Sequence, residues 1–286
     1  MNSHELNSDL EHAVELAERA GPIAASYFRS RVEVENKSKS AFDPVTIADR
    51  EVEAFVRAEL RSRFPGDTIL GEEMGEEIGE EAGEEAGEEA GQAARSDVGQ
   101  LTQRRWVIDP IDGTRAFITG MPAWGILLGL QESQVPVLGV MHQPFTGETF
   151  FGAQGAAAKL RQSGSERTIT TRRGVRLADA VLYCTHPDIF SEASEREAFE
   201  RVSRTSRMTR FGGDCYAYCL LALGQIDLVI EAGLNLYDIV PLIPIIEAAG
   251  GVVTDAVGGS AAEGGFIVAA GSPELHAETL RVLRAG

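Results

Sequence analysis

The chain has 286 residues, of which 43% are hydrophobic, enough to form one large core or two smaller ones. Acidic residues outnumber basic residues 44 to 26, which gives a formal net charge of -18. A charge of this sign repels nucleic acids and anionic membranes, so neither is expected as a partner.

The first quarter of the chain predicts two helices, a short strand and an insertion. Apolar residues recur at helical spacing over 8–30 and over 45–63, and a Pro-Gly-Asp stop is followed by a strand at 68–70. Residues 71–90 then repeat a Gly-Glu-Glu unit five times. Frequent glycines and adjacent glutamates oppose a helix, so a solvated, largely disordered insertion is predicted over 71–100.

The rest of the chain predicts an α/β protein. Strand patterns lie at 105–109, 126–130, 135–141, 149–152 and 158–161. Four further strands, at 180–184, 208–211, 226–230 and 251–254, alternate with helices at 192–202, 216–223 and 237–249. We therefore expect two layered subdomains with a cleft between them, an N-terminal α+β part over 1–174 and a C-terminal α/β part over 175–286.

Three features predict a cytoplasmic protein. Residues 1–20 carry five acids where a secretory signal would have basic and apolar regions. The longest apolar stretch, 239–249, contains two prolines and is too short to cross a bilayer. The cysteines, Cys184, Cys215 and Cys219, do not form a disulfide framework. No Cys or His partner at zinc-finger spacing accompanies Cys215 and Cys219, so core packing is expected for these two.

The segment WVIDPIDGT, residues 106–114, is the most informative part of the sequence. Asp109 and Asp112 follow a buried strand, at the end where open α/β sheets place their sites, and Pro110 bends the chain between them. The two carboxylates and the Ile111 carbonyl are hard oxygen ligands, which favour Mg²⁺ or Mn²⁺ over zinc.

Gly113 and Thr114 complete this segment and begin a helix or turn whose N–H groups suit a phosphate. A metal pair beside such a cradle is typical of phosphoryl transfer to water. The sequence Asp-Pro-x-Asp-Gly also occurs in ordinary surface turns. Glu72 after the strand at 68–70, and Asp238, would add carboxylates to the cleft, although singly they fit a solvated acid and a helix N-cap.

Five motifs together carry a resemblance to a known family. DPVTIAD (43–49), GEE (71–73), WVIDPIDGT (106–114), GGD (212–214) and the segment 231–251 resemble the inositol monophosphatase superfamily of Mg²⁺-dependent phosphatases over nearly the whole chain. The stretches after Thr114 and before Tyr237 are more similar to its histidinol-phosphate phosphatase branch. The resemblance implies sandwiched subdomains of alternating sheets and helices, as in the fold shared with fructose-1,6-bisphosphatase, and a homodimer.

The resemblance also implies a set of metal ligands for two or three Mg²⁺ ions, with Mn²⁺ as a substitute. One ion would be held by Glu72, Asp109 and the Ile111 carbonyl, and the second by Asp109, Asp112 and Asp238. Glu72 would also bind or position water at a third, weaker metal site.

The remaining implied roles concern water, phosphate and substrate. Asp49 would hydrogen-bond Thr114, whose hydroxyl orients the attacking water, and the N–H groups of Gly113 and Thr114 would hold phosphate. Asp214 and Glu231 stand where family members place specificity groups. Acidic walls attract the ammonium and imidazole of histidinol phosphate, although Asp214 also fits a helix N-cap.

The predicted function is hydrolysis of L-histidinol phosphate to L-histidinol and phosphate, a step of histidine biosynthesis, by metal-activated water. Inositol-1-monophosphatase or a related small-molecule phosphatase stays open. So does, from another class, a catalytically inactive acidic scaffold or regulatory protein. A covalent aspartyl phosphatase of the haloacid-dehalogenase type is disfavoured, because it needs D-x-D-G-T where this chain has D-P-I-D-G-T.

Two points of the match stay open. Lys37 and Lys39 both lie near a lysine often found in the first loop of family members, and the sequence does not decide between them. Because the GEE unit is repeated, a later copy also competes with Gly71-Glu72-Glu73 as the metal ligand.

Overall fold

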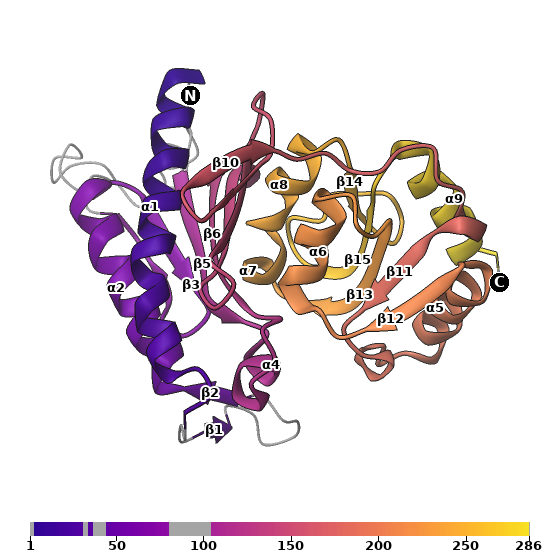
Figure 1. Ribbon diagram of the computed structural model, residues 1–286, viewed down its shortest axis with the longest axis horizontal. Helices are drawn as coiled ribbons and strands as arrows, with labels where there is room; N and C mark the ends of the chain where they lie inside the picture. Colours follow the sequence, from indigo (N-terminus) through magenta and orange to yellow (C-terminus); the bar gives the residue numbers. More distant parts are fainter. Residues whose placement is uncertain (1–2, 31–33, 37–43, 80–103, 286) are drawn as a thin grey trace, which may run out of the picture.

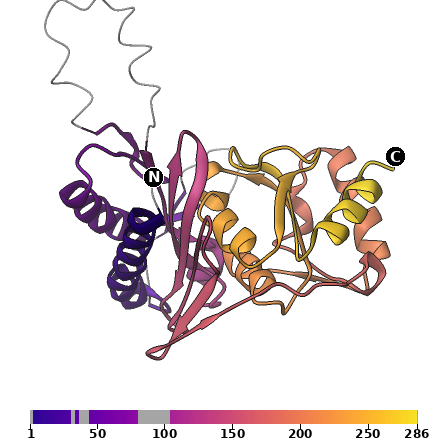
Figure 2. The same ribbon diagram turned by 90° about the horizontal axis from the view of Figure 1, so that it is seen from above.

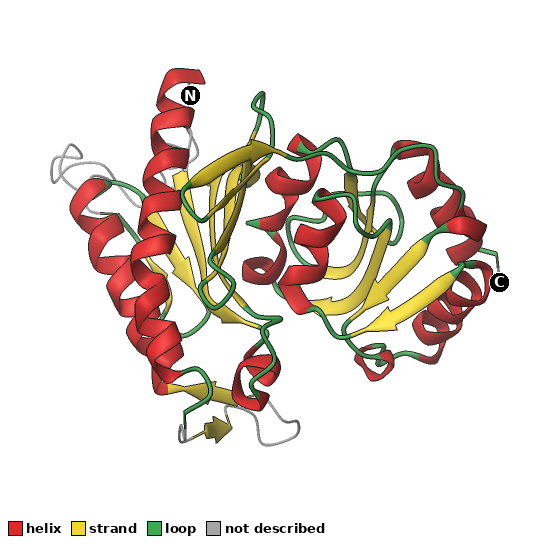
Figure 3. Ribbon diagram, in the orientation of Figure 1, coloured by secondary structure: helices red, strands yellow, loops and turns green. Residues whose placement is uncertain are grey.

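Sheets and helices alternate in layers through the molecule (Figure 1, Figure 3). The computed structural model describes residues 3–30, 34–36, 44–79 and 104–285. Lys37, Lys39 and the repeat from residue 80 onward lie outside these described residues. From one side to the other, the layers are a helix pair, a large sheet, a central group of helices, a smaller sheet and a second helix pair, an order that Figure 2 shows from above.

The larger sheet has eight strands in the order β10-β9-β8-β7-β6-β5-β3-β4, and β3 and β5 are its parallel pair. Its strands are β3 (Thr68–Gly71), β4 (Gly75–Glu77), β5 (Arg104–Asp112), β6 (Gly125–Glu132), β7 (Val135–Gln143), β8 (Glu148–Ala153), β9 (Lys159–Gln162) and β10 (Ser165–Thr168). Helices cover both faces, which is why β5 to β8 read as nearly continuous apolar runs.

The outer helices of this sheet are α1 (Ser3–Tyr27) and α2 (Ile47–Arg63). A short ladder of β1 (Val34–Asn36) and β2 (Pro44–Thr46) precedes α2. A capping box starts α2, since the Thr46 hydroxyl accepts from Ala48 N and the Asp49 carboxylate accepts from Thr46 N at 2.9 Å. The apolar stripe of α2 then packs on the sheet, and this fixes the direction in which its polar residues point.

The smaller sheet has five strands in the order β12-β11-β13-β15-β14. They are β11 (Val181–Cys184), β12 (Met208–Phe211), β13 (Leu228–Leu234), β14 (Val252–Asp255) and β15 (Gly265–Ala270). The outer helices here are α5 (Ala193–Thr205) and α9 (Pro273–Leu283), and two single turns, η2 (Leu177–Asp179) and η3 (Pro187–Ile189), flank β11. None of the helices in the described part of the chain combines the length and apolar character needed to cross a membrane.

The central helices are α6 (Asp214–Ala222), α7 (Leu236–Ile239) and α8 (Leu242–Ala248), and they approach the larger sheet very closely. Gly129, Gly139 and Gly152 pair in register across β6, β7 and β8 beneath them. A Cβ on Gly139 would lie 1.7 Å from the Pro241 carbonyl oxygen. This row of glycines lets the α7–α8 bend rest directly on the sheet.

Most predicted elements are present, with ends displaced by a few residues, but one helix is wrong. The helix predicted over 237–249 is two helices that break near Pro241, which has no N–H to continue the hydrogen-bond ladder. The strands β10 and β15 and helix α9 were not predicted. The division of the chain near residue 174 stays a prediction. The strands of the eight-stranded sheet precede that point, and those of the five-stranded sheet follow it.

The disorder predicted for the start of the repeat is also wrong. Disorder was predicted from residue 71, yet β3 ends in a tight turn and Gly75–Glu77 forms β4, antiparallel to β3. Arginines offset the repulsion between adjacent glutamates on which the prediction of disorder was based. Arg61 Nε donates to Glu77 Oε1 at 2.9 Å, and Arg105 lies 3.7 Å from Glu76.

Candidate active site

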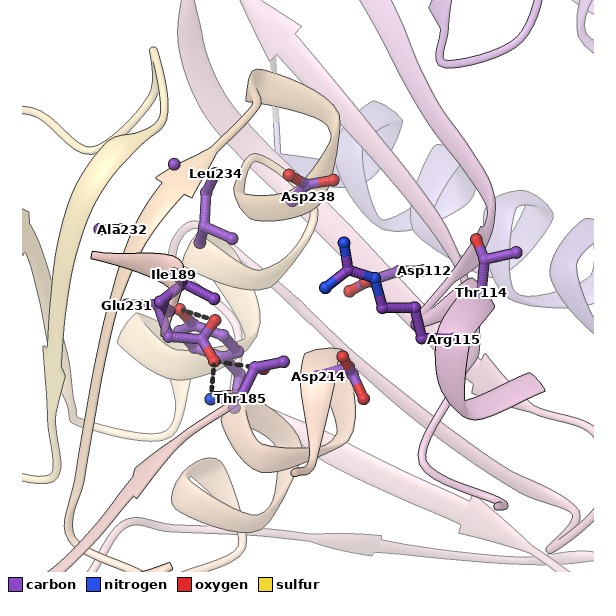
Figure 4. A pocket seen from close by; sticks show the side chains of 13 residues that line it. Asp112, Thr114, Arg115, Thr185, Ile189, Asp214, Glu231, Ala232, Leu234 and Asp238 are labelled. Atoms are coloured by element: carbon purple, nitrogen blue, oxygen red, sulfur yellow. Dashed lines mark hydrogen bonds between the residues drawn. The ribbon is translucent and has the colours of Figure 1, made fainter. Parts of the chain in front are cut away.

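A cavity of about 250 Å³ lies where the end of β5 faces β13 and the central helices (Figure 4). Its lining includes four acids that come from distant parts of the sequence, Asp112, Asp214, Glu231 and Asp238. In the close-up, Asp112 and Asp238 stand near one another, while Glu231 and Thr114 lie on opposite sides of the cavity. The cavity therefore collects acids from both sheets.

The end of β5 is irregular, and this irregularity arranges its acids. Residues three apart in a regular strand point to opposite faces, but the pairing with β6 shifts register between Asp109 and Asp112. The Ile111 N–H donates to Asp109 Oδ1 at 3.1 Å, which holds the Asp109 carboxylate against its own turn. Burial, followed by the charges of Glu72, Asp112 and Asp238, raises the pKa of Asp109 well above its ordinary value.

Glu72 and Asp238 reach the same place from other elements. The parallel pairing of β3 with β5 sets Glu72 beside the end of β5, where its N–H donates to Ile108 O at 3.2 Å. Asp238 is the third residue of α7, and its Oδ2 accepts from the N–H of the N-cap residue Asn235 at 2.6 Å. The N-cap interpretation of Asp238 is therefore wrong. Burial, as the main cause, raises the pKa of Asp238 to about 7.

Asp49 and Thr114 are not hydrogen-bonded as predicted. The Thr114 hydroxyl instead donates to the Ile111 carbonyl at 3.1 Å, and Asp49 Oδ2 accepts from the Thr46 hydroxyl at 2.6 Å. The other oxygen of Asp49, Oδ1, is buried and has no hydrogen-bond partner. Desolvation by burial is the main reason why the pKa of Asp49 is raised.

Gly113 adopts a left-handed conformation at the entry to α4 (Thr114–Thr119), with φ of 84°. A side chain there would be strained, and its Cβ would also lie 2.9 Å from the Ala123 carbonyl oxygen. Glycine thus permits the sharp turn from β5 into α4 that brings Gly113 and Thr114 to the cavity wall. Their role as phosphate donors stays a prediction.

Glu231 and Asp214 form the acidic part of the wall contributed by β13 and α6. Glu231 is buried and accepts three hydrogen bonds, from Thr185 N at 2.8 Å, Thr185 Oγ1 at 2.5 Å and the Tyr218 hydroxyl at 3.1 Å. Burial raises the pKa of Glu231 to about 7 and that of Asp214 to about 6. The N-cap of α6 is Gly213, so the N-cap interpretation of Asp214 is wrong.

Sequence reasoning missed Arg115, Thr185 and Tyr218. Arg115 is the basic residue among the described residues that line the cavity, and its guanidinium points into the cavity in front of Asp112 (Figure 4). Its position directly after Thr114 was a signal that could have identified it. Thr185 and Tyr218 gave no local signal, because they hydrogen-bond Glu231 from 46 and 13 residues away in the sequence.

The donor set fits a hard divalent cation. In the described ranges, no three Asp, Glu, His or Cys side chains form a ready-made metal cage. Glu72 and Asp238 nevertheless lie close enough to Asp109 to interact directly with its carboxyl group. Neighbouring buried carboxylates repel one another unless a proton or a cation offsets their charge, and oxygen-only ligands match Mg²⁺ or Mn²⁺. The buried Asp49 Oδ1 has no hydrogen-bond partner, and a bound water or ion would satisfy it.

Cys215 and Cys219 lie in the core, as predicted, and Cys184 is buried as well. Cys184, Cys215 and Cys219 are free and buried, and burial raises the pKa of each thiol far above its ordinary value. They are therefore packing residues.

Comparisons with known proteins agree with this fold and site. The family model described as the inositol monophosphatase family matches residues 5–285. The chain is 38% identical to the chloroplastic bifunctional phosphatase IMPL2 of Arabidopsis thaliana, over 94% of this chain and 72% of that protein. It is 31% identical to a histidinol-phosphatase of Mycobacterium tuberculosis, over 98% of this chain and 99% of the relative.

A solved structure of an inositol monophosphatase from Zymomonas mobilis superimposes with a TM-score of 0.79, at 34% identity and over 99% of both chains. The layered fold and its carboxylate-lined cavity thus define a phosphatase. The chain belongs to the inositol monophosphatase family. The predicted family and fold class are confirmed.

Proposed function

We propose that this phosphatase hydrolyses L-histidinol phosphate to L-histidinol and inorganic phosphate, with Mg²⁺ as its cofactor. The observation that carries the proposal is the meeting of Asp112, Asp214, Glu231 and Asp238 in one cavity. Asp112 and Asp238 are themselves predicted metal ligands, and their charges act on Asp109. Asp214 and Glu231 line the part of the cavity contributed by α6 and β13. A site with both features suits a phosphate ester whose other end is cationic.

The acids would divide between two metal positions. Glu72, Asp109 and the Ile111 carbonyl would hold one ion, Asp109, Asp112 and Asp238 would hold another, and Glu72 would serve a third, weaker position. Bound there, such ions supply charge compensation for phosphoryl oxygens and lower the pKa of water.

The chain's own residues would orient the reactants. The N–H groups of Gly113 and Thr114 donate to phosphate, and the Thr114 hydroxyl positions the attacking water. Asp49 Oδ1 has no partner, and the predicted bond from Thr114 to Asp49 would require the Thr114 hydroxyl to leave the Ile111 carbonyl.

The cationic end of histidinol phosphate would face Glu231 and Asp214. Histidinol carries an ammonium and an imidazole, whereas inositol offers only hydroxyl groups, which gain less from an acidic wall. Relatives named histidinol-phosphatase and a relative named inositol-1-monophosphatase both match the chain, at 31% and 26% identity. The chemistry of the wall therefore favours the histidinol ester, and inositol monophosphate is the second candidate.

Phosphate release from histidinol phosphate tests the proposal. We expect turnover that requires Mg²⁺ and falls at least about 100-fold in Asp112→Asn, because each ligand carboxylate holds the charge that stabilises the reaction. Asp179→Asn, an exposed acid of η2, is the matched control and should act like wild type. Turnover that survives Asp112→Asn, or that needs no divalent ion, contradicts the mechanism. A folded chain without turnover supports the inactive acidic scaffold.

A substrate panel tests the specificity. Histidinol phosphate, inositol monophosphate, fructose bisphosphate and adenosine bisphosphate should be compared at equal Mg²⁺. If inositol monophosphate is clearly best, the histidinol assignment is wrong while the mechanism stands. We further propose that the protein is cytoplasmic and forms a homodimer. Light scattering on the purified chain tests the homodimer, which would have twice the monomer mass.

A further inference from the structure

A buried ion pair on α2 lies directly against the turn that carries Glu72. Glu53 is fully buried, and its Oε1 accepts from Arg57 Nε at 2.8 Å, one helical turn along α2. Neither side chain lines the cavity. A buried pair is costly to desolvate and gives little net stability by itself, so its contacts with the rest of the chain need an explanation.

Those contacts go to the backbone of the turn. Glu53 Oε2 accepts from Glu73 N at 2.7 Å, and Oε1 accepts from Met74 N at 3.0 Å. Arg57 Nη2 donates to the Gly75 carbonyl oxygen. The pair therefore holds the three residues that follow Glu72 by their main-chain atoms, a contact that does not depend on their side chains.

Only a glycine allows this approach at the start of the turn. A Cβ on Gly71 would lie 2.1 Å from Glu53 Oε1 and 2.9 Å from Arg57 Nη2, so the Glu53 carboxylate occupies the space of a side chain. Gly71 is thereby locked between α2 on one side and its pairing with β5 on the other. Glu72, the next residue, has little freedom left.

The glutamates of the second repeat copy, Glu76 and Glu77, have different partners from Glu72. Glu77 Oε2 lies 3.3 Å from Arg57 Nη1, and Arg61 also binds Glu77. Glu76 lies 3.7 Å from Arg105. The two copies have the same letters, yet the acids of the second are paired with arginines, whereas Glu72 lies beside Asp109.

We propose that Glu53, with Arg57, is a positioning residue that fixes the 71–75 turn so that Glu72, and not a later glutamate, serves as the metal ligand. This rests on the proposed function, which makes Glu72 a ligand. Glu53 acts only through the main chain of the turn, so its loss should change metal affinity more than it changes the binding of substrate.

Glu53→Gln tests this role without changing the size of the side chain. Both carboxylate oxygens accept N–H bonds, and glutamine replaces one oxygen with a donor that would face another donor. We expect Mn²⁺ affinity, measured calorimetrically on the metal-free protein, to fall about 10- to 100-fold, as for other residues that orient ligands. The amides of Glu73 and Met74 should also exchange hydrogen faster.

Glu59→Gln is the matched control, because it removes a different ion pair from the same helix. Glu59 binds Arg19 at 2.8 Å on the outer surface, away from the turn. This variant should keep wild-type Mn²⁺ affinity. At saturating Mg²⁺, the KM of Glu53→Gln for histidinol phosphate should stay within about threefold of wild type. An equal loss of Mn²⁺ affinity in both variants would overturn the proposal, because general destabilisation would then explain it.

Glu72→Gln separates failure of the positioning role from failure of the proposed function. If Glu72→Gln loses Mn²⁺ affinity while folded Glu53→Gln keeps it, the positioning role is wrong and the ligand assignment stands. If Glu72→Gln binds Mn²⁺ as wild type does, the ligand assignment itself is wrong. Where Glu53→Gln does not fold, Arg57→Lys carries the test: it keeps the charge but loses the planar guanidinium that spans Glu53 and Gly75, and unchanged Mn²⁺ affinity would again overturn the proposal.

Discussion

Glu231→Gln should make the protein more stable at alkaline pH while weakening its recognition of a cationic substrate. Both hydrogen bonds from Thr185 go to Oε1 of Glu231, and the Tyr218 hydroxyl goes to Oε2. A glutamine can place its amide oxygen on the two Thr185 donors and donate its N–H to the Tyr218 oxygen. The substitution thus removes a buried charge and keeps both Thr185 bonds, while the Tyr218 O–H loses its acceptor at a cost that does not change with pH.

The magnitude follows from the pKa of Glu231, which burial raises from 4.5 to about 7. The folded protein keeps this proton up to about pH 7, whereas the unfolded chain releases it near pH 4.5, so unfolding releases a proton between these values. Stability therefore falls as pH rises through this window. At about 1.36 kcal/mol per pKa unit, the wild type loses about 3 kcal/mol by pH 8, and the glutamine variant is spared this loss.

Urea unfolding with a chelator present, followed by tryptophan fluorescence, measures this difference. We expect the stability of Glu231→Gln relative to the wild type to be about 2.5 kcal/mol greater at pH 8 than at pH 5. Glu192→Gln, at the exposed start of α5, should change neither value. A gain of the same size at both pH values, or a loss at pH 8, would refute the reasoning.

Three other variants probe the surroundings of the site. Gly139→Ala should lose about 3 kcal/mol of unfolding free energy, because its Cβ would meet the Pro241 oxygen at 1.7 Å, and Mn²⁺ affinity should fall with it as α7 and Asp238 shift. Deleting residues 80–91 should leave hydrolysis within about twofold of wild type, since the contacts described above lie outside them and loop length costs little. Arg115→Met should raise KM for phosphate esters about 10-fold with a smaller change in kcat, which steady-state kinetics would show.

The parts of the site that could be predicted are those whose signal is local in the sequence. Asp109, Asp112 and Gly113 stand within five residues of one another, around a proline that forces a bend, so their juxtaposition required no knowledge of the fold. The helix predicted over 45–63 begins at Ile47, because Thr46 and Asp49 form a capping box, a local signal that the apolar spacing alone does not use.

The parts that were missed depend on contacts between distant segments. Arg57, Arg61 and Arg105 stabilise the first repeats, and each is 16 or more residues away in sequence from the glutamate that it contacts. Local propensity does not register such partners. The hydroxyl of Thr114 bonds to the Ile111 carbonyl in its own turn instead of to Asp49. Comparison of motifs does not take such a local competing acceptor into account.

Three acids of the site, Asp109, Asp238 and Asp49, share one arrangement that the motifs do not reveal. Asp109 gives one oxygen to the Ile111 N–H, and Asp238 gives one to the Asn235 N–H. Asp49 does the same with Thr46 and keeps its second oxygen free. Each carboxylate is thus fixed by its own backbone before any ligand arrives, so little side-chain entropy remains to be lost on binding. Repulsion among the fixed charges is the cost of this order, and a bound divalent cation would offset it.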